Sequence, residues 1–316
     1  RVFDRERLFE LLDSACAAPA LWLAAPPGAG KTTLVATWLR RRGAPTLWMQ
    51  LDDSDADPAT FMQSLGALWA GLVAAPPNLP ALRADDLADL PGWLRRRLVH
   101  MLPLLPPRWS LVLDNHQELP AQSPLHDALA RMLAELPAGV QWLFVSREAP
   151  SAAYTGALAR QQLAIIDAEA LRFDDAETRT LIRLHGRAES LAHSLEAAQG
   201  WAAGLTLMLL GAARDAALPA PAARERLFDY FAGEALSRMP AEQQQALGAL
   251  AHLPSTTAEL AIAMSGYARA PEVLEQLAAS SLFTDRREGP PAVFVFHALF
   301  SEFLRRKPGI DGVRAA

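Results

Sequence analysis

The run from Ala24 to Thr33, AAPPGAGKTT, constrains the fold of this chain more than any other stretch. It follows an apolar segment at 21–23 and opens an amphipathic one that contains Leu34 and Trp38. This order of strand, glycine turn and helix start is the context that a phosphate-binding loop requires. We therefore expect a sheet that ends in the loop and a helix that begins where the loop stops.

The residues of this loop have the chemistry needed to bind a nucleoside triphosphate. The glycines allow backbone N–H groups to turn around an anion, and the start of the helix adds partial positive charge. Lys31 can reach the β- and γ-phosphates, and Thr32 can offer its hydroxyl to Mg²⁺. The common pattern begins with glycine where this chain has Ala25, so a glycine turn with a chance GKT is the alternative. The predicted nucleotide-binding residues here are Gly28, Ala29, Gly30, Lys31, Thr32 and Thr33.

Bulk properties exclude several other classes of protein. The 316 residues are enough for about two or three domains, and a hydrophobic content of 51% indicates a packed core. A net charge of −5 argues against a broad nucleic-acid surface. The single cysteine, Cys16, excludes internal disulfides and suits a reducing cytoplasm. The longest apolar stretch, at 201–213, is too short to span a bilayer and predicts a buried helix. We expect a cytoplasmic piece of a longer protein, with no membrane contact.

The first half of the chain alternates strand and helix patterns, as a parallel sheet requires. Strands are predicted at residues 21–25, 46–51, 110–114, 141–145 and 163–166. Helices are predicted between them at about residues 32–42, 59–74, 92–102, 124–136 and 153–160. This half is expected to be an α/β P-loop NTPase domain with a parallel sheet of about five strands, of the ASCE or AAA+-like kind.

After Phe173 the strand signal largely disappears, and acidic residues from Asp174 onward mark a helix start. Near the end, 281–284 and 293–296 flank a charged turn in a hairpin pattern. Helices followed by a hairpin predict a winged-helix arrangement. Further helices are expected at about residues 223–238, 241–252, 256–265, 273–279 and 297–305.

A nucleotide site also needs a carboxylate to hold the magnesium. Asp114 ends the apolar run 111–113, which places it at the carboxyl edge of the predicted sheet, where a role toward Mg²⁺ outweighs that of a turn residue. The next position is Asn115, whose amide cannot usefully accept a proton, so we expect slow hydrolysis. Arg147 follows the fourth strand and can reach the γ-phosphate, with a solvated surface arginine as the alternative. Asp114 and Arg147 are therefore the candidate catalytic residues, and Thr32 and Asp114 the candidate magnesium ligands.

The strand at 46–51 fits the P-loop subclass in which another strand separates the lysine loop from the aspartate strand. Asp52 and Asp53 follow it, and we interpret them as a helix-capping loop rather than as catalytic residues.

Several blocks, taken in order, resemble the nucleotide-binding module of MalT-like, LuxR-type regulators, which belong to the STAND class of signal-transduction ATPases. They span nearly the whole chain, and each is weak alone. The blocks are Arg5-Glu6-Arg7-Leu8, the loop itself, Trp48, Leu51-Asp52, Phe61, Asp114-Asn115-His116-Gln117-Glu118, Ser146-Arg147, Leu171-Arg172-Phe173, Gly200-Trp201-Ala202-Ala203-Gly204-Leu205, Phe296-His297-Ala298-Leu299-Phe300 and Phe303-Leu304.

The resemblance implies three parts that close over a nucleotide: a P-loop domain at 1–168, a helical domain at 169–235 and a winged-helix domain at 236–316. It also implies that Arg5 approaches the adenine and that His297 touches the β-phosphate in the closed, ADP-bound state. On the sequence alone, His297 is equally well interpreted as a packing residue. The chain departs from many members at Asn115, where a second aspartate is common, and at Thr206, where related proteins carry an adenine-packing proline.

The function that the resemblance implies is an ATP/ADP switch in a bacterial transcription regulator. ADP would hold the domains closed, and ATP with an inducer would open them and allow self-association. Inducer and DNA contacts would lie in regions beyond this chain. The alternatives are an AAA+-like motor or DNA loader, which requires a basic surface, and a small-molecule kinase, which leaves everything after about residue 170 without a role.

Overall fold

The computed structural model describes residues 3–70, 84–90, 92–93, 96–97, 108–186, 198–214, 236, 239–279, 283–287 and 289–306. Contacts divide the chain into two compact units. The sheet unit comprises Asp4–Ala25 and Lys31–Leu171. The helical unit comprises Arg1–Phe3, Pro26–Gly30 and Arg172–Ala316.

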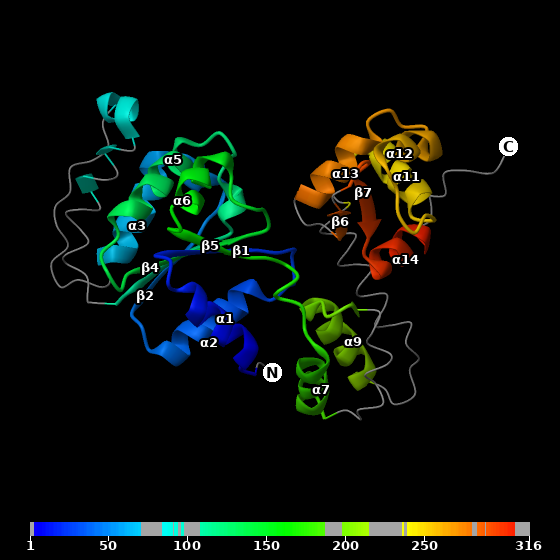
Figure 1. Ribbon diagram of the computed structural model, residues 1–316, viewed down its shortest axis with the longest axis horizontal. Coiled ribbons are helices and arrows are strands. Elements are labelled where there is room, and N and C mark those ends of the chain that lie inside the picture. The colour runs from blue at the N-terminus through cyan, green and yellow to red at the C-terminus, as the bar shows by residue number, and fades with distance from the viewer. Residues whose placement is uncertain are drawn as a thin grey trace. The chain divides into compact units, whose positions relative to one another are not determined.

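The sheet unit is built on five parallel strands in the order β2-β3-β4-β1-β5 (Figure 1). The central strands are continuous apolar runs because helices cover both faces of the sheet. Helices α1 and α2 lie on one face, and α3, α5 and α6 lie on the other (Figure 1). The strands are β1 (Ala20–Ala24), β2 (Thr46–Gln50), β3 (Ser110–Asp114), β4 (Gln141–Ser146) and β5 (Leu163–Ile166). The helices are α1 (Glu6–Ala15), α2 (Lys31–Arg42), α3 (Pro58–Ala70), α5 (Pro124–Met132) and α6 (Thr155–Ala159).

Five short 3-10 helices complete the described part of the sheet unit. They are η1 (Asp53–Ala56), η2 (Ala84–Asp89), η4 (His116–Glu118), η5 (Leu133–Glu135) and η6 (Ala152–Tyr154). Asp52 caps η1: its side chain accepts the Ser54 N–H, and the Asp55 side chain accepts the Asp52 N–H in return. Asp52 and Asp53 therefore form a capping loop, as the sequence analysis predicted.

The strand predictions are confirmed to within one residue at each end, and the strand order agrees with the predicted P-loop subclass. The strand that separates β1 from β3 in space is β4, rather than the strand at 46–51. All neighbouring strands run parallel, so the residues that end β1, β3 and β4 share one edge of the sheet. Ala24 pairs with Ser146, and Asp114 pairs with Val145, directly before Ser146.

Helix α1 is an element that the sequence analysis did not predict. It buries Leu8, Phe9 and Leu12 along one side. Its first turn carries Glu6 and Arg7, and these charges hide a helical pattern that has only three buried positions. The predicted helix at 59–74 corresponds to α3, and the one at 92–102 falls mostly outside the described residues.

The helical unit contains helices and one antiparallel hairpin. Its elements are α7 (Asp175–Leu184), α9 (Ala202–Arg214), α11 (Ala241–Leu250), α12 (Ala258–Ser265), α13 (Ala270–Ala279), β6 (Thr284–Arg287), β7 (Val293–Phe296) and α14 (Ala298–Arg306). Asp174 caps α7 in a reciprocal pair with Glu177, which confirms the predicted helix start. The buried helix expected at 201–213 is α9, while the helix expected at 223–238 lies outside the described residues.

The hairpin and its flanking helices form one apolar core with α9. Phe283, Phe294 and Phe300 are all buried in it, and the hairpin connects α13 to α14 as a wing does. Across the described helices, none is both long and apolar enough to cross a bilayer.

Candidate nucleotide site

The side chains of Thr32 and Asp114 meet at the carboxyl edge of the sheet. Thr32 lies in the first turn of α2, and Asp114 is the last residue of β3. The Thr32 hydroxyl donates to the Asp114 carboxylate, with Oγ1 3.1 Å from Oδ2 and 3.3 Å from Oδ1. Asp114 is only 3% exposed, and its Oδ1 also accepts the N–H of Asn115. A hydroxyl beside a fixed carboxylate is the oxygen donor set that suits Mg²⁺.

Lys31 begins α2 and is half-buried beside this pair. Its Nζ donates to the carbonyl of Ala25, at the end of the strand it follows. Burial, and to a smaller extent the positive charge of Arg147, lower the pKa of Lys31 to about 8, whereas Asp114 acts in the opposite direction. A cation held out of water in this way gains from a phosphate, which would restore its counter-charge.

The lowered pKa of Lys31 predicts a pH dependence of nucleotide binding. Above pH 8 the free protein loses the Lys31 proton, and binding of ADP must take that proton back, because phosphate raises the pKa. We expect ADP affinity to fall about fivefold between pH 8 and pH 9, a range in which the phosphates of ADP are already ionised. Calorimetric titrations at both pH values test this. Lys31→Arg serves as the control, since arginine keeps its charge and should give a flat profile.

The tip of the loop is held by contacts within the helical unit. Gly28 and Gly30 have φ values of 73° and 87°, in the region that favours glycine. The Ala29 N–H donates to the Pro26 carbonyl across a turn centred on Pro27 and Gly28. Two features exclude a side chain at Gly28. Its φ is positive, and an added Cβ would lie 2.5 Å from the Cβ of Ala203. Of the remaining predicted loop residues, Ala29 is buried and Thr33 is exposed at the start of α2.

The segment after Asp114 connects the aspartate strand to the arginine strand. Asn115 has φ 60° and ψ 41°, a left-handed conformation that asparagine tolerates, and it starts η4. The Gln117 Oε1 then accepts the backbone N–H of Arg147 at 3.0 Å. The sequence analysis did not assign Gln117 a role. This hydrogen bond joins the backbone of Arg147, the candidate γ-phosphate residue, to η4, which directly follows β3.

His116, the first residue of η4, holds this segment against the core of the sheet unit. It is 1% exposed, and its ring packs against Trp22 and Phe144. Its Nε2 lies 3.2 Å from the Tyr154 hydroxyl. Burial, and then the neighbouring His126, lower the pKa of His116 to about 3, so the ring is neutral at physiological pH. A neutral, enclosed imidazole of this kind serves packing, and it holds η4 in place for Asn115 and Gln117.

Arg5 is buried, at 8% exposed, and its Nη1 donates to the carbonyl of Leu171 at 2.9 Å. Arg7 makes a similar bond to the carbonyl of Ala170 at 3.0 Å. These two bonds fasten the start of α1 to the end of the sheet unit. The expected contact of Arg5 with adenine stays a prediction.

His297 lies between β7 and α14, and its backbone N–H donates to the Phe283 carbonyl at 2.8 Å. Its Nδ1 accepts the N–H of Leu299 at 3.3 Å, so the proton of the neutral ring belongs on Nε2. Among the described residues this buried Nε2 makes no hydrogen bond of good geometry. Burial lowers the pKa of His297, and a hydrogen-bond interaction with the Ala198 carbonyl acts in the opposite direction. A neutral ring whose buried N–H is not bonded in good geometry can donate to an anion, which is the chemistry that a phosphate contact needs.

Comparisons with known proteins agree with this description. The MalT winged helix domain family matches residues 232–309, and the family described as Nephrocystin 3, N-terminal, matches residues 1–147. The HTH-type transcriptional regulator MalT of Serratia proteamaculans is 27% identical over 316 residues, covering 96% of this chain and 35% of that protein. This chain is a MalT-like module: it is similar to MalT over nearly its whole length, and its C-terminal part matches the MalT winged helix domain. It spans about a third of the length of the curated relatives it matches.

Solved structures support the fold of the MalT-like module. A Walker-type ATPase of Pyrococcus abyssi is similar at a TM-score of 0.63 and 15% identity, with 96% of each chain covered. A STAND protein with a tetratricopeptide repeat sensor from Pyrococcus horikoshii is similar at a TM-score of 0.51 and 14% identity, covering 96% of this chain and 42% of that one. The fold is a P-loop NTPase followed by helical and winged-helix parts. The division into three domains at 1–168, 169–235 and 236–316 stays a prediction.

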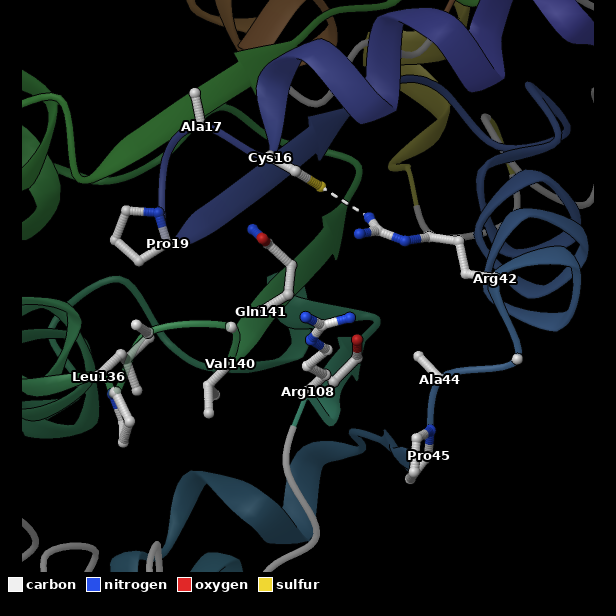
Figure 2. A pocket seen from close by; sticks show the side chains of 15 residues that line it. Cys16, Ala17, Pro19, Arg42, Ala44, Pro45, Arg108, Leu136, Val140 and Gln141 are labelled. Atoms are coloured by element: carbon white, nitrogen blue, oxygen red, sulfur yellow. Dashed lines mark hydrogen bonds between the residues drawn. The ribbon is translucent and has the colours of Figure 1, made fainter.

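A pocket of about 720 Å³ lies elsewhere in the MalT-like module, at the edge of the sheet where the strands begin (Figure 2). It is lined by the ends of α1 and α2 and by the starts of β2, β3 and β4. Arg42 turns toward Cys16, with Nη1 3.2 Å from Sγ (Figure 2). The same guanidinium also approaches Asp13 at 3.6 Å. None of the predicted nucleotide residues lines it, so it is separate from the candidate site.

Proposed function

We propose that this MalT-like module is the ATP/ADP-binding switch of a bacterial transcription regulator. The observation that carries the proposal is the hydrogen bond between Thr32 and Asp114, beside the half-buried Lys31. A hydroxyl, a carboxylate and a half-buried cation at the carboxyl edge of a parallel sheet together suit a magnesium-bound polyphosphate.

Magnesium would enter this site with the nucleotide. The described residues contain no group of three or more histidine, cysteine or acidic side chains that could hold a metal alone. Thr32 and Asp114 supply two oxygen donors, which fits an ion that takes its other ligands from phosphate oxygens and water. The ion would neutralise phosphate charge, while Lys31 and Arg147 hold the remaining negative oxygens.

A switch requires a contact that differs between its two nucleotide states. His297 supports this role because its buried Nε2–H makes no hydrogen bond of good geometry among the described residues. We infer that it donates to the β-phosphate of ADP in a closed state and that ATP, together with an inducer, favours an open state that self-associates. Arg5 would approach the adenine in both states.

The open state would act through parts of the regulator that lie beyond this chain. We assign the inducer and DNA contacts to those parts and place the protein in the cytoplasm. The arginines of the helical unit support this assignment over a DNA loader, since several are paired with acids. The pairs are Arg172–Asp285 at 3.4 Å, Arg286–Glu275 at 3.1 Å and Arg306–Glu302 at 2.8 Å.

Slow ATP hydrolysis is the kinetic test of a switch. Asn115 occupies the position after Asp114 where an acid would orient the attacking water, and an amide accepts no proton there. We expect turnover well below the roughly 1–1,000 per second typical of enzymes. Steady-state phosphate release from purified protein with Mg²⁺ and ATP measures it. The variant Asn115→Asp restores an acid at this position and should hydrolyse ATP faster. Turnover of many per second in the unaltered protein would favour a motor instead.

A further inference from the structure

The Gly200–Leu205 motif contains a tryptophan that reaches the phosphate-binding loop. Trp201 directly precedes α9, and the residue is buried, at 7% exposed. Its indole Nε1 donates to the Pro27 carbonyl at 3.0 Å, across 174 positions of sequence and with both atoms buried. The sequence analysis named this motif only as part of a family resemblance and gave Trp201 no role. The nucleotide site described above gives it none either.

A second hydrogen bond joins the same two segments. The backbone N–H of Ala203 donates to the Gly28 carbonyl at 2.9 Å. Ala203 lies in the first turn of α9, where helical N–H groups have no partner inside their own helix. The loop carbonyl supplies that partner. Two consecutive carbonyls of the loop are therefore held by donors at the start of a single helix.

This arrangement fixes the direction of the loop's peptide groups. The C=O of one residue and the N–H of the next belong to the same rigid trans plane and point in opposite directions. With the Pro27 carbonyl directed at Trp201, the N–H of Gly28 must point away from the indole. A loop that binds phosphate needs its N–H groups turned toward the anion before the anion arrives.

Local packing around the ring keeps Trp201 in this position. An added Cβ at Gly204 would lie 2.5 Å from Cε3 of the indole, so glycine lets the ring lie flat against the first turn of α9. Phe283 and His297 contact the ring edge to face, at centroid distances of 5.3 Å and 6.1 Å. The indole is thus enclosed by α9, the hairpin and the loop tip.

We propose that Trp201 is a positioning residue of the phosphate-binding loop: its indole N–H, with the Ala203 N–H, holds the Pro27 and Gly28 carbonyls so that the Gly28 N–H faces the polyphosphate of ADP or ATP. This inference rests on the proposed nucleotide function and adds the residues that preorganise the loop. It also links the loop to His297 through one aromatic ring, so movement of the winged-helix part would reach the loop directly.

The test compares two buried tryptophans. Trp201→Phe keeps most of the ring and removes the donor, and we expect ADP to bind about tenfold more weakly, because a buried carbonyl loses its partner. The matched control is Trp142→Phe in β4, since the Trp142 indole nitrogen is buried with no partner among the described residues. It should lower the melting temperature to a similar extent and leave ADP affinity unchanged. Calorimetric titration at a temperature where both variants are folded measures the difference.

A second variant tests the same role of the loop contacts without changing the Trp201 ring. Ala203→Pro deletes the second donor at a helical position where proline is tolerated, and it should also weaken ADP while Trp201 is intact. Equal ADP affinity in Trp201→Phe and unaltered protein, or equal loss in Trp201→Phe and Trp142→Phe, would overturn the inference. Lys31→Ala distinguishes a failure of the nucleotide site from a failure of the positioning role of Trp201. If it abolishes binding while Trp201→Phe does not weaken it, the nucleotide site stands and only the positioning role fails.

Discussion

Lys31→Ala is expected to abolish measurable binding of both ADP and ATP while the chain still folds. Lys31 is a half-buried cation whose pKa is lowered to about 8, so a phosphate beside it would stabilise its charge. Removing it takes away the strongest electrostatic contact to the polyphosphate. It should leave or raise the melting temperature of the nucleotide-free protein, because a depressed lysine pKa means that the folded state holds the charge less well than the unfolded chain. Calorimetric titration with each nucleotide is the measurement.

Arg40→Ala provides the matched control for Lys31→Ala. Arg40 is an exposed cation on the same helix, α2, so its removal changes the net charge equally without touching the loop. It should bind ADP as the unaltered protein does. If Lys31→Ala binds ADP with unchanged affinity, the phosphate-loop interpretation is wrong. If both variants weaken binding alike, the effect is one of overall charge rather than of the site.

The part of the site that lies on the sheet was predictable because local patterns determine it. An apolar run that ends in a polar residue marks the carboxyl end of a buried strand, and parallel strands bring these ends to one edge. Asp114 and Arg147 were predicted in this way, and the structure places the Thr32 hydroxyl in contact with Asp114. The P-loop subclass predicted that another strand separates β1 from β3, and the structure places β4 there rather than the strand at 46–51.

Contacts between distant segments were not predictable from a single sequence. Nothing around Trp201 indicates that its indole reaches Pro27, because both the tryptophan and the turn have ordinary local roles. The same holds for Gln117, whose bond to the Arg147 backbone depends on the neighbouring strand order. Helix α1 was missed for a different reason: its apolar side is short, and its charged first turn resembles a loop.

His297→Ala is expected to weaken ADP more than ATP. The buried Nε2–H makes no hydrogen bond of good geometry among the described residues, and the lowered pKa keeps the ring neutral, so it can donate one hydrogen bond to a charged oxygen. Losing such a bond costs about 1–3 kcal/mol, equivalent to roughly a 5- to 150-fold loss of ADP affinity. ATP, which favours the open state, should lose little. The mutant should also release ADP faster and populate more open or oligomeric forms, because a ligand shifts an equilibrium only through contacts that differ between states.

Packing is the competing explanation for His297, and a second variant separates it from a phosphate contact. His297 lies edge to face with Trp201, so alanine leaves a gap in the core, whereas His297→Phe fills that space without an N–H donor. If His297 holds the β-phosphate, both variants release ADP faster, and the phenylalanine variant keeps the melting temperature of the nucleotide-free protein. Stopped-flow release of a fluorescent ADP analogue and melting curves without nucleotide give the two readouts. Normal ADP release in both variants, with lower stability in the alanine variant alone, would make His297 a core residue and leave the proposed switch without its latch.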